Sequence, residues 1–349
     1  MERRALIYYF TGTGNAWRLA RLAAREFEKQ GCRTTIVPVE HGRIHPDHKD
    51  MEYIGFACPV LGFGLPQMMA RFLRRLPRGA RRKAFVLIAM GNSERVRVGS
   101  RQWSVPPTEG VSMIQAIVWL VLKGYRVRNA MACEMPTNWI LAVNPPGEKD
   151  VKVLYERTAE RIEKFIDSLL REEKSLSLIK PWWAIPCALV YCLFVFIGRR
   201  IAGKWFVVNK RCDSCRQCSR QCPQGTIKWR SGRPYWGWDC QQCFRCINLC
   251  PQHAIEVSAL TLIGTFIPLI VMHYIYRHIP SPFAGQSRPL AMSAHVLCYF
   301  ILAAVAVGVI HHLQCSSLTG KYVPRWPLTG HRARYKEPDF EAPERGEPA

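Results

Sequence analysis

The feature that most constrains this chain is a cysteine pattern that occurs twice. The pattern is Cys-x2-Cys-x2-Cys-x3-Cys-Pro, and its members are Cys212, Cys215, Cys218, Cys222 and Pro223, then Cys240, Cys243, Cys246, Cys250 and Pro251. Every member of the second copy lies 28 positions after its counterpart, so the pattern is an internal repeat. Three thiolates on one tight loop hold three corners of an iron–sulfur cubane, while the fourth cysteine reaches the sister cluster. The repeat therefore predicts two 4Fe–4S clusters.

Zinc is the alternative, because paired Cys-x2-Cys units also form zinc ribbons. A zinc ion has no use for a third cysteine three residues further on, nor for a fourth that is followed by proline. The spacing favours iron–sulfur clusters over zinc.

Residues 206–257 resemble the bacterial-type ferredoxins that carry two 4Fe–4S clusters, with all eight ligands and both prolines present. The resemblance implies one cluster on Cys212, Cys215, Cys218 and Cys250 and another on Cys240, Cys243, Cys246 and Cys222. Several cations stand beside these ligands in the sequence, namely Arg211, Arg216, Arg220, Lys228, Arg230 and Arg245. They either offset the negative charge of the clusters, which would raise the reduction potential, or form a solvated surface.

Residues 1–172 show a different pattern, in which apolar runs alternate with amphipathic segments. The predicted strands are Leu6–Phe10, Thr34–Val39, Tyr53–Cys58, Ala84–Met90 and Tyr125–Cys133. The predicted helices are Ala16–Gln30, Gln67–Leu76, Val111–Lys123 and Asp150–Leu170. Such alternation is typical of a parallel sheet covered on both faces. We therefore expect a doubly wound α/β domain.

A glycine turn, Thr11-Gly12-Thr13-Gly14-Asn15, follows the first predicted strand and opens the first helix. Backbone amides and the helix N-terminus then face one point, which is an arrangement that binds a phosphate group. The spacing departs from Gly-x-Gly-x-x-Gly, and no Gly-Lys-Thr/Ser follows. Dinucleotide binding and a P-loop are both disfavoured.

The stretch from Phe10 to Asn15 resembles the phosphate loop of flavodoxins, which bind FMN at the carboxyl ends of their strands. By this resemblance the FMN phosphate binds at Thr11, Gly12, Thr13, Gly14, Asn15 and Ala16. Flavodoxins usually carry a hydroxyl residue where this chain has Ala16. The loops after the third and fourth strands lie where flavodoxins hold the flavin ring, which adds Pro59, Val60, Gly62, Met90, Gly91 and Asn92. The alternative is a flavodoxin-like domain that holds no cofactor.

Three apolar stretches follow the α/β region. Ala259–Tyr276 and Leu290–Ile310 have 18 and 21 residues, close to the roughly 20 that cross a bilayer. We expect a transmembrane hairpin, with buried helices of a soluble protein as the alternative. Basic residues of the tail place the ferredoxin domain and the tail on the cytoplasmic side. Trp182–Ile197 is shorter and contains Pro186, so we expect a helix at the membrane interface or a packed linker.

Composition limits the classes of partner. Lysine and arginine number 49 against 26 acidic residues, which gives a net charge of +23, yet no nucleic-acid-binding signature is present. An anionic membrane surface or an acidic redox protein explains this charge better. Because no secretory signal opens the chain, we expect its 15 cysteines in a reducing cytoplasm.

These observations predict five regions: a flavodoxin-like FMN domain (1–172), an apolar linker (173–205), a ferredoxin domain (206–257), a transmembrane hairpin (258–313) and a basic, proline-rich tail (314–349). The order of the first three resembles that of flavodoxin–ferredoxin fusion proteins. The leading hypothesis is a membrane-associated electron-transfer protein that links two-electron and one-electron partners through FMN and two clusters. The alternatives are an FMN-dependent reductase of a quinone or small organic acceptor, and a redox sensor. No catalytic residue is predicted.

Overall fold

The computed structural model describes residues 3–41, 44–91, 96–98, 101–103, 108–141, 143–176, 181–230, 232–278, 288–316, 319, 322–323 and 325–344. The chain divides into two compact units. The first consists of residues 1–195, 243–249 and 333–349, and the second of residues 196–242 and 250–332. Each unit is described by itself.

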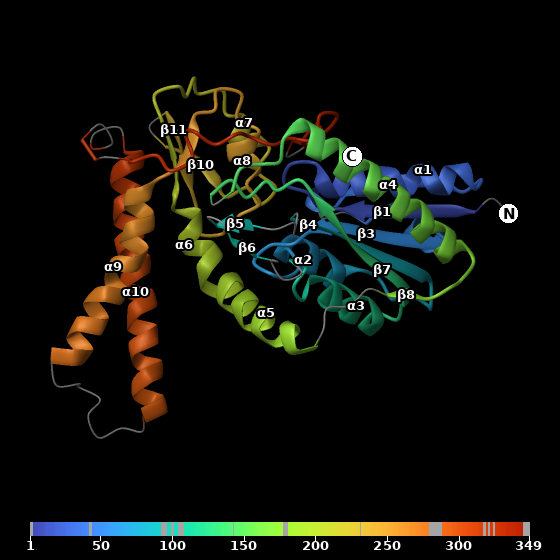
Figure 1. Ribbon diagram of the computed structural model, residues 1–349, viewed down its shortest axis with the longest axis horizontal. Coiled ribbons are helices and arrows are strands. Elements are labelled where there is room, and N and C mark those ends of the chain that lie inside the picture. Colours follow the sequence, from blue (N-terminus) through green and yellow to red (C-terminus); the bar gives the residue numbers. More distant parts are fainter. Residues whose placement is uncertain are drawn as a thin grey trace. The chain divides into compact units, whose positions relative to one another are not determined.

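A six-stranded sheet forms the centre of the first unit (Figure 1). Its strands are β1 (Arg4–Tyr9), β2 (Arg33–Pro38), β3 (Tyr53–Pro59), β4 (Lys83–Gly91), β7 (Arg126–Met135) and β8 (Ser175–Leu176). They pair in the order β2-β1-β3-β4-β7-β8, and every pair is parallel. The first five follow the 2-1-3-4-5 order of the flavodoxin-like fold, which confirms the predicted fold class.

Two layers of helices cover the sheet (Figure 1). One layer contains α1 (Asn15–Lys29) and α4 (Glu148–Leu170), and the other contains α2 (Gln67–Arg75) and α3 (Ser112–Leu122). The first core is built around Phe27, Phe85 and Phe165, and the second around Tyr8 and Phe56. Because side chains alternate along a strand, neighbouring residues of β1 enter opposite cores.

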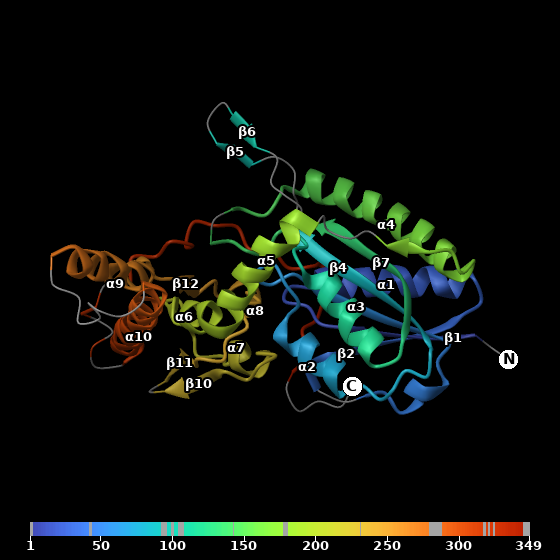
Figure 2. The same cartoon turned by 90° about the horizontal axis from the view of Figure 1, so that it is seen from below.

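The first unit also contains shorter elements. They are the 3₁₀ turns η1 (Val39–His41) and η2 (Pro46–Asp50), the hairpin of β5 (Val96–Val98) and β6 (Arg101–Trp103), and the helix α5 (Pro181–Leu193). Figure 2 shows the β5–β6 hairpin standing away from the sheet. One face of α5 packs on Val111, through Cys187 and its neighbours.

The second unit holds most of the cysteine repeat. Its elements are the π-helical turn η3 (Phe194–Gly198), which begins in the first unit, then α6 (Arg199–Gly203), β9 (Phe206–Val208), α7 (Gln217–Arg220), β10 (Ile227–Arg230), β11 (Arg233–Trp236) and β12 (Ile255–Val257). The short helix α8 (Arg245–Asn248) belongs to the first unit. Strands β10 and β11 pair antiparallel, as do β9 and β12.

Two long apolar helices complete the second unit: α9 (Ala259–His278) and α10 (Arg288–Cys315). They lie side by side in Figure 1, and the hydroxyl of Tyr299 on α10 donates to the carbonyl oxygen of Thr265 on α9, at 3.2 Å. Within the described residues, two helical segments are long and apolar enough to cross a membrane: Trp182–Gly203 and Val296–Cys315. The first part of α9, Ala259–Pro268, is apolar but shorter.

Candidate functional site

The phosphate loop, Thr11–Ala16, connects β1 to α1. Gly14 adopts a φ of +109°, a conformation that L side chains rarely adopt, and thereby lets the chain turn into the helix. The Gly14 amide donates to Thr11 Oγ1 at 3.0 Å. Thr13 Oγ1 is buried and finds no hydrogen-bond partner among the described residues. An unpaired hydroxyl beside a helix N-terminus is a donor suited to an anion.

All six residues of the phosphate loop are buried by other parts of the first unit. A Cβ at Gly12 would collide with the carbonyl oxygen of Cys243 and would lie 3.0 Å from Asn138 Nδ2. A Cβ at Gly14 would collide with Glu337 and would lie 2.8 Å from Phe340 Cβ. Cys243 of the cysteine repeat and the C-terminal residues Glu337 and Phe340 therefore lie against this loop.

The donor chemistry of the loop fits the phosphate of FMN, since it offers a helix N-terminus, Thr11 and an unpaired Thr13 hydroxyl. The space over the loop, however, is filled by Cys243, Glu337 and Phe340, and Glu337 carries a carboxylate. The phosphate and this arrangement of the chain do not fit at the same time.

The loops predicted to hold the flavin ring lie at the carboxyl ends of β3 and β4. Pro59, Val60, Gly62, Met90 and Gly91 are each half-buried. Asn92 lies outside the described residues. Two aromatic side chains cover the first of these loops: the Phe194 ring would collide with a Cβ at Gly62, and the Tyr191 ring would collide with one at Gly64.

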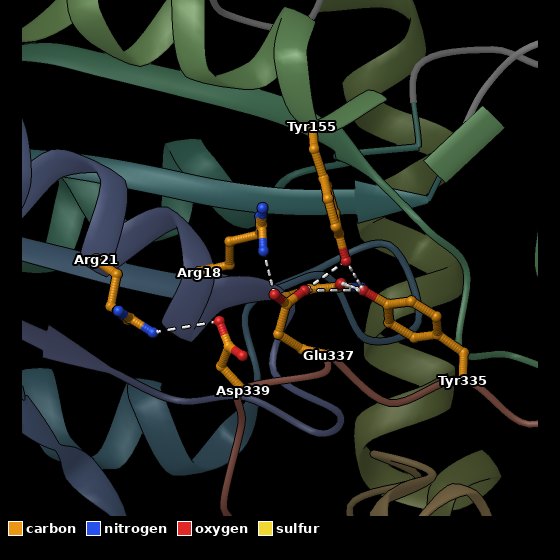
Figure 3. A network of polar contacts seen from close by, with 7 residues as sticks. Arg18, Arg21, Tyr155, Tyr335, Glu337 and Asp339 are labelled. Atoms are coloured by element: carbon orange, nitrogen blue, oxygen red, sulfur yellow. Dashed lines mark hydrogen bonds and ion pairs between the residues drawn. The ribbon is translucent and has the colours of Figure 1, made fainter. Parts of the chain in front are cut away.

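Glu337 occupies the centre of a polar network beside α1 (Figure 3). Its side chain is fully buried and accepts hydrogen bonds from Arg18 and from the Tyr155 hydroxyl. The Tyr335 hydroxyl lies 3.3 Å from the same carboxylate and 2.8 Å from Asn15 Oδ1. Burial and the nearby negative charge of Glu337 raise the pKa of Tyr335, so its hydroxyl keeps its proton and acts as a donor.

Arg245 of α8 forms the second connection to the phosphate loop. Its guanidinium is 1 % exposed and forms a fork-like pair with both carboxylate oxygens of Glu40. It also donates to the carbonyl oxygens of Thr11, at 2.5 Å, and Gly12, at 3.1 Å. Arg245 is thus paired with a carboxylate and hydrogen-bonded to the phosphate loop, so it does not form part of a solvated surface.

The first copy of the repeat lies in the second unit and is accessible to solvent. Cys215 is exposed, whereas Cys212, Cys218 and Cys250 are half-buried. Burial and, to a smaller extent, the negative charges of Cys250, Cys212 and Cys215 together raise the pKa of Cys218 to about 12. These four cysteines, which the resemblance assigns to one cluster, therefore lie within electrostatic reach of one another. Four such thiolates fit a cationic iron core.

The second copy has the same backbone in a different setting. Gln242 and Phe244 adopt left-handed φ values of +56° and +57°, as Ser214 and Arg216 do at the equivalent positions, with +64° and +63°. Cys240 and Cys222 are buried, whereas Cys243 and Cys246 are half-buried. A Cβ at Gly203 would lie 2.6 Å from Cys240 Cβ, so only glycine allows this approach.

Two buried cations stand close to Cys240. Arg199 donates to its carbonyl oxygen at 3.1 Å. Lys204 is fully buried; its ammonium donates to the carbonyl oxygen of Trp236, at 2.5 Å, and lies over the ring of Trp238. No carboxylate of the described residues pairs with Lys204. Burial lowers the pKa of its ammonium to about 8.

Within the described part of the chain, no group of three or more His, Cys, Asp or Glu side chains is arranged to hold one metal ion. Four thiolates on a zinc ion lie about 3.8 Å apart, given a Zn–S bond of about 2.3 Å. A cubane is wider than a single ion and spreads its ligands further. The absence of such a group among the described residues therefore applies to sites for a single metal ion and not to cubane clusters.

Sequence reasoning did not find several residues of the site. Glu40, Lys204, Tyr335 and Glu337 belong to no motif; the sequence placed Tyr335 and Glu337 in the tail and singled out neither Glu40 nor Lys204. The one available signal is the spacing of apolar and charged residues in Tyr335-Lys336-Glu337-Pro338-Asp339-Phe340, where the aromatic residues frame an acid.

Comparisons with known proteins agree with this description. Residues 204–251 match the family described as a 4Fe–4S dicluster domain. No curated protein matches the chain. Similar solved structures include an archaeal flavodoxin (15 % identity, 47 % of this chain, 99 % of that one, TM-score 0.30), the flavodoxin of Streptococcus pneumoniae TIGR4 (16 %, 48 %, 99 %, 0.33) and Flavodoxin 2 of Bacillus cereus (14 %, 48 %, 99 %, 0.34).

The strand order, rather than these distant similarities, carries the assignment of the first unit. The dicluster match covers the cysteine repeat and supports iron–sulfur chemistry and a role in electron transfer. The chain therefore combines a flavodoxin-like fold with a 4Fe–4S dicluster domain, as expected of a flavodoxin–ferredoxin fusion.

Proposed function

We propose that the chain is a membrane-associated electron-transfer protein that connects a flavin site to an exposed redox partner through two 4Fe–4S clusters. The observation that carries the proposal is the unequal exposure of the two copies of the repeat. Cys243 of the second copy lies against the phosphate loop, whereas Cys215 of the first copy faces solvent. This difference supports electron exchange inside the protein through the second copy and with a partner through the first.

The residues assigned to each cofactor follow the two resemblances. Cys212, Cys215, Cys218 and Cys250 would hold one cluster, and Cys240, Cys243, Cys246 and Cys222 the other. Thr11, Thr13 and the amides at the start of α1 would hold the FMN phosphate once the residues over the loop have moved. When bound, FMN exchanges electrons singly or in pairs, and each cluster carries one. Arg245 connects the α8 part of the second copy to the phosphate loop, because its guanidinium donates to the carbonyl oxygens of Gly12 and Thr11.

The surface of the first copy suits an acidic partner protein. Five cations of this region are exposed: Arg211, Arg216, Arg220, Lys228 and Arg230. Positive charge around an exposed cluster ligand steers an acidic protein to that ligand and speeds encounter at low salt. The sequence left open whether these residues compensate the clusters or face solvent, and their exposure supports the second role.

Membrane association is supported by two separate surfaces. On α5, Trp182, Ile185, Leu189 and Leu193 are spaced at helical intervals and each is more than half exposed, whereas the opposite face packs on the first unit. This one-sided apolar face suits a helix that lies in the membrane interface. On α9 and α10, exposed Phe266, Ile270, Leu297 and Ile301 suit contact with lipid. The basic tail then assigns both redox domains to the cytoplasmic side.

The reductase alternative needs a flavin ring that is open to a quinone or another small acceptor. Phe194 and Tyr191 cover the loop at Gly62 and Gly64, which favours a carrier over an enzyme with an open flavin face.

The test is anaerobic purification in detergent, with iron, acid-labile sulfide and FMN measured per chain in membrane and soluble fractions. We expect about eight irons and eight sulfides per chain, found in the membrane fraction. Stoichiometric zinc, or full iron in the soluble fraction, would contradict the cluster assignment or the membrane assignment respectively.

A further inference from the structure

We propose that the C-terminal segment, Tyr335–Phe340, is an intramolecular competitor of FMN: the docked segment and the FMN phosphate exclude each other at the phosphate loop. This inference rests on the proposed function only in assigning FMN to that loop. It assigns a role to residues that the sequence had placed in a tail.

The segment packs into the first unit and does not lie only on its surface. Tyr335, Glu337 and Phe340 are buried, whereas Lys336 and Asp339 between them are exposed. The Glu337 amide donates to the carbonyl oxygen of Thr13 at 2.8 Å, so the segment is hydrogen-bonded to the loop backbone itself. The Phe340 ring lies 5.7 Å from that of Trp17 in the first turn of α1.

The loop presents features that attract an anion. The N-terminus of α1 carries partial positive charge, Arg18 stands in its first turns, and Thr13 Oγ1 is buried without a partner. The Cβ of Glu337 lies against Gly14, and the Glu337 carboxylate lies beside Arg18 in these first turns. Glu337 pairs with Arg18, while Tyr155 and Tyr335 supply hydroxyl groups around it (Figure 3).

Space excludes a second anion. Glu337 and Phe340 lie so close to Gly14 that even one added carbon would collide with Glu337. A phosphate group is larger and doubly charged, and it would approach a buried carboxylate in a region of low dielectric. FMN therefore reaches the loop only when the segment leaves. Its apparent dissociation constant is then raised by the factor that favours the docked state.

The experiment compares FMN binding by the full chain with that of two variants, Glu337→Ala and Asp339→Ala, with clusters intact and by equilibrium dialysis. Glu337→Ala removes the partner of Arg18, Tyr155 and Tyr335, so we expect FMN to bind at least tenfold more tightly than to the unaltered chain. Asp339 is the matched control, because it is an exposed acid of the same segment that lies 3.7 Å from the exposed guanidinium of Arg21, and we expect Asp339→Ala to bind FMN about as tightly as the unaltered chain. Riboflavin is the matched ligand, because it lacks the phosphate and its binding should not change.

A second measurement does not depend on any variant. Since linkage is reciprocal, saturating FMN should release the segment in the unaltered chain and accelerate amide hydrogen exchange over residues 335–340. Equal FMN affinity of the unaltered chain and Glu337→Ala, with exchange unchanged by FMN, would overturn the competition alone. Failure of all three proteins to bind FMN would overturn the assignment of FMN to the loop, and the competition with it.

Discussion

In the first copy of the cysteine repeat, Cys215 and most of its neighbours face solvent, whereas in the second copy Cys243 is half-buried and most of its neighbours are buried. Exposed Arg216 and Arg220 of the first copy correspond to Phe244 and Asn248 of the second, which are 3 % and 5 % exposed. The backbones agree, since α7 and α8 have four residues each at equivalent positions and the same positions adopt left-handed φ values. The comparison teaches that the cysteine spacing determines the local chain path, while the residues between the cysteines determine what that path contacts.

The contrast is sharpest at Gln217 and Arg245, the first residues of α7 and α8. Gln217 is half-buried and donates to Gln221 at 3.3 Å. Arg245 is buried and binds Glu40, Thr11 and Gly12. Residues 212–222 of the first copy thus lie outside the flavodoxin-like unit, whereas residues 243–249 of the second copy belong to it.

The largest expected effect is the loss of a cluster from either copy. Cys215→Ser and Cys243→Ser alter equivalent ligands, one exposed and one half-buried. We expect each variant to lose about half of its iron and sulfide, because each removes one ligand from one cubane. Iron analysis and EPR spectroscopy measure this. Unchanged iron in either variant would break the equivalence of the two copies.

The next largest effect is a difference between the copies in how much the free energy of unfolding falls when equivalent residues are replaced. Arg245→Ala leaves Glu40 buried without its cation, and we expect it to lower the free energy of unfolding by roughly 3–5 kcal/mol. The equivalent change, Gln217→Ala, should cost no more than about 0.5 kcal/mol. Urea unfolding of both variants measures the difference. The double variant Arg245→Ala/Glu40→Gln should recover part of the loss, and equal effects of the two single changes would contradict the contrast.

A third effect concerns reduction potential. Lys204 is a buried cation near Cys240, and a positive charge in a low-dielectric region favours the reduced, more negative cluster. We expect Lys204→Met to lower one midpoint potential by roughly 60 mV, a tenfold change for one electron. Redox titration followed by EPR measures the shift. Arg220→Met, which removes an exposed cation of the first copy, is the control. A larger shift for Arg220→Met than for Lys204→Met would contradict the expectation that the buried cation has the greater effect on the potential.

The smallest effect concerns the surface of the first copy. Arg216→Glu should slow electron transfer to an acidic redox protein by about threefold to tenfold at low ionic strength, because steering by exposed charge is lost. Stopped-flow rates at increasing salt measure this, and the difference should vanish as salt screens the charges. Lys152→Glu on α4, equally exposed but remote in sequence, is the control. A salt-independent effect would argue against docking at the first copy.

The sequence predicted the main sheet closely. Predicted strand Tyr53–Cys58 is observed as Tyr53–Pro59, and predicted helix Gln67–Leu76 as Gln67–Arg75. These elements were predictable because apolar periodicity reports which face of a strand or helix is buried. The cysteine ligands were equally predictable from the sequence, because their spacing is a pattern that spans only a few residues of the chain.

The surroundings of the phosphate loop were not predictable in this way. The sequence presents Thr11–Ala16 as an open anion site, yet the structure buries it beneath Cys243 and Glu337. The sequence left open whether Arg245 compensates a cluster or faces solvent, and the structure shows it buried and paired with Glu40. A local pattern carries no information on which distant residue will fill the space above a turn.

The sequence by itself thus determined the parallel α/β sheet, the two cysteine loops and the apolar helices, because each depends on periodicity or spacing within a short stretch of chain. Only the tertiary structure decided that the two loops differ in exposure and that an acid lies against the phosphate loop. Arg18 and Glu337 are separated by 319 positions. Contacts between residues so far apart arise only when whole elements assemble, since burial and charge pairing are then settled together.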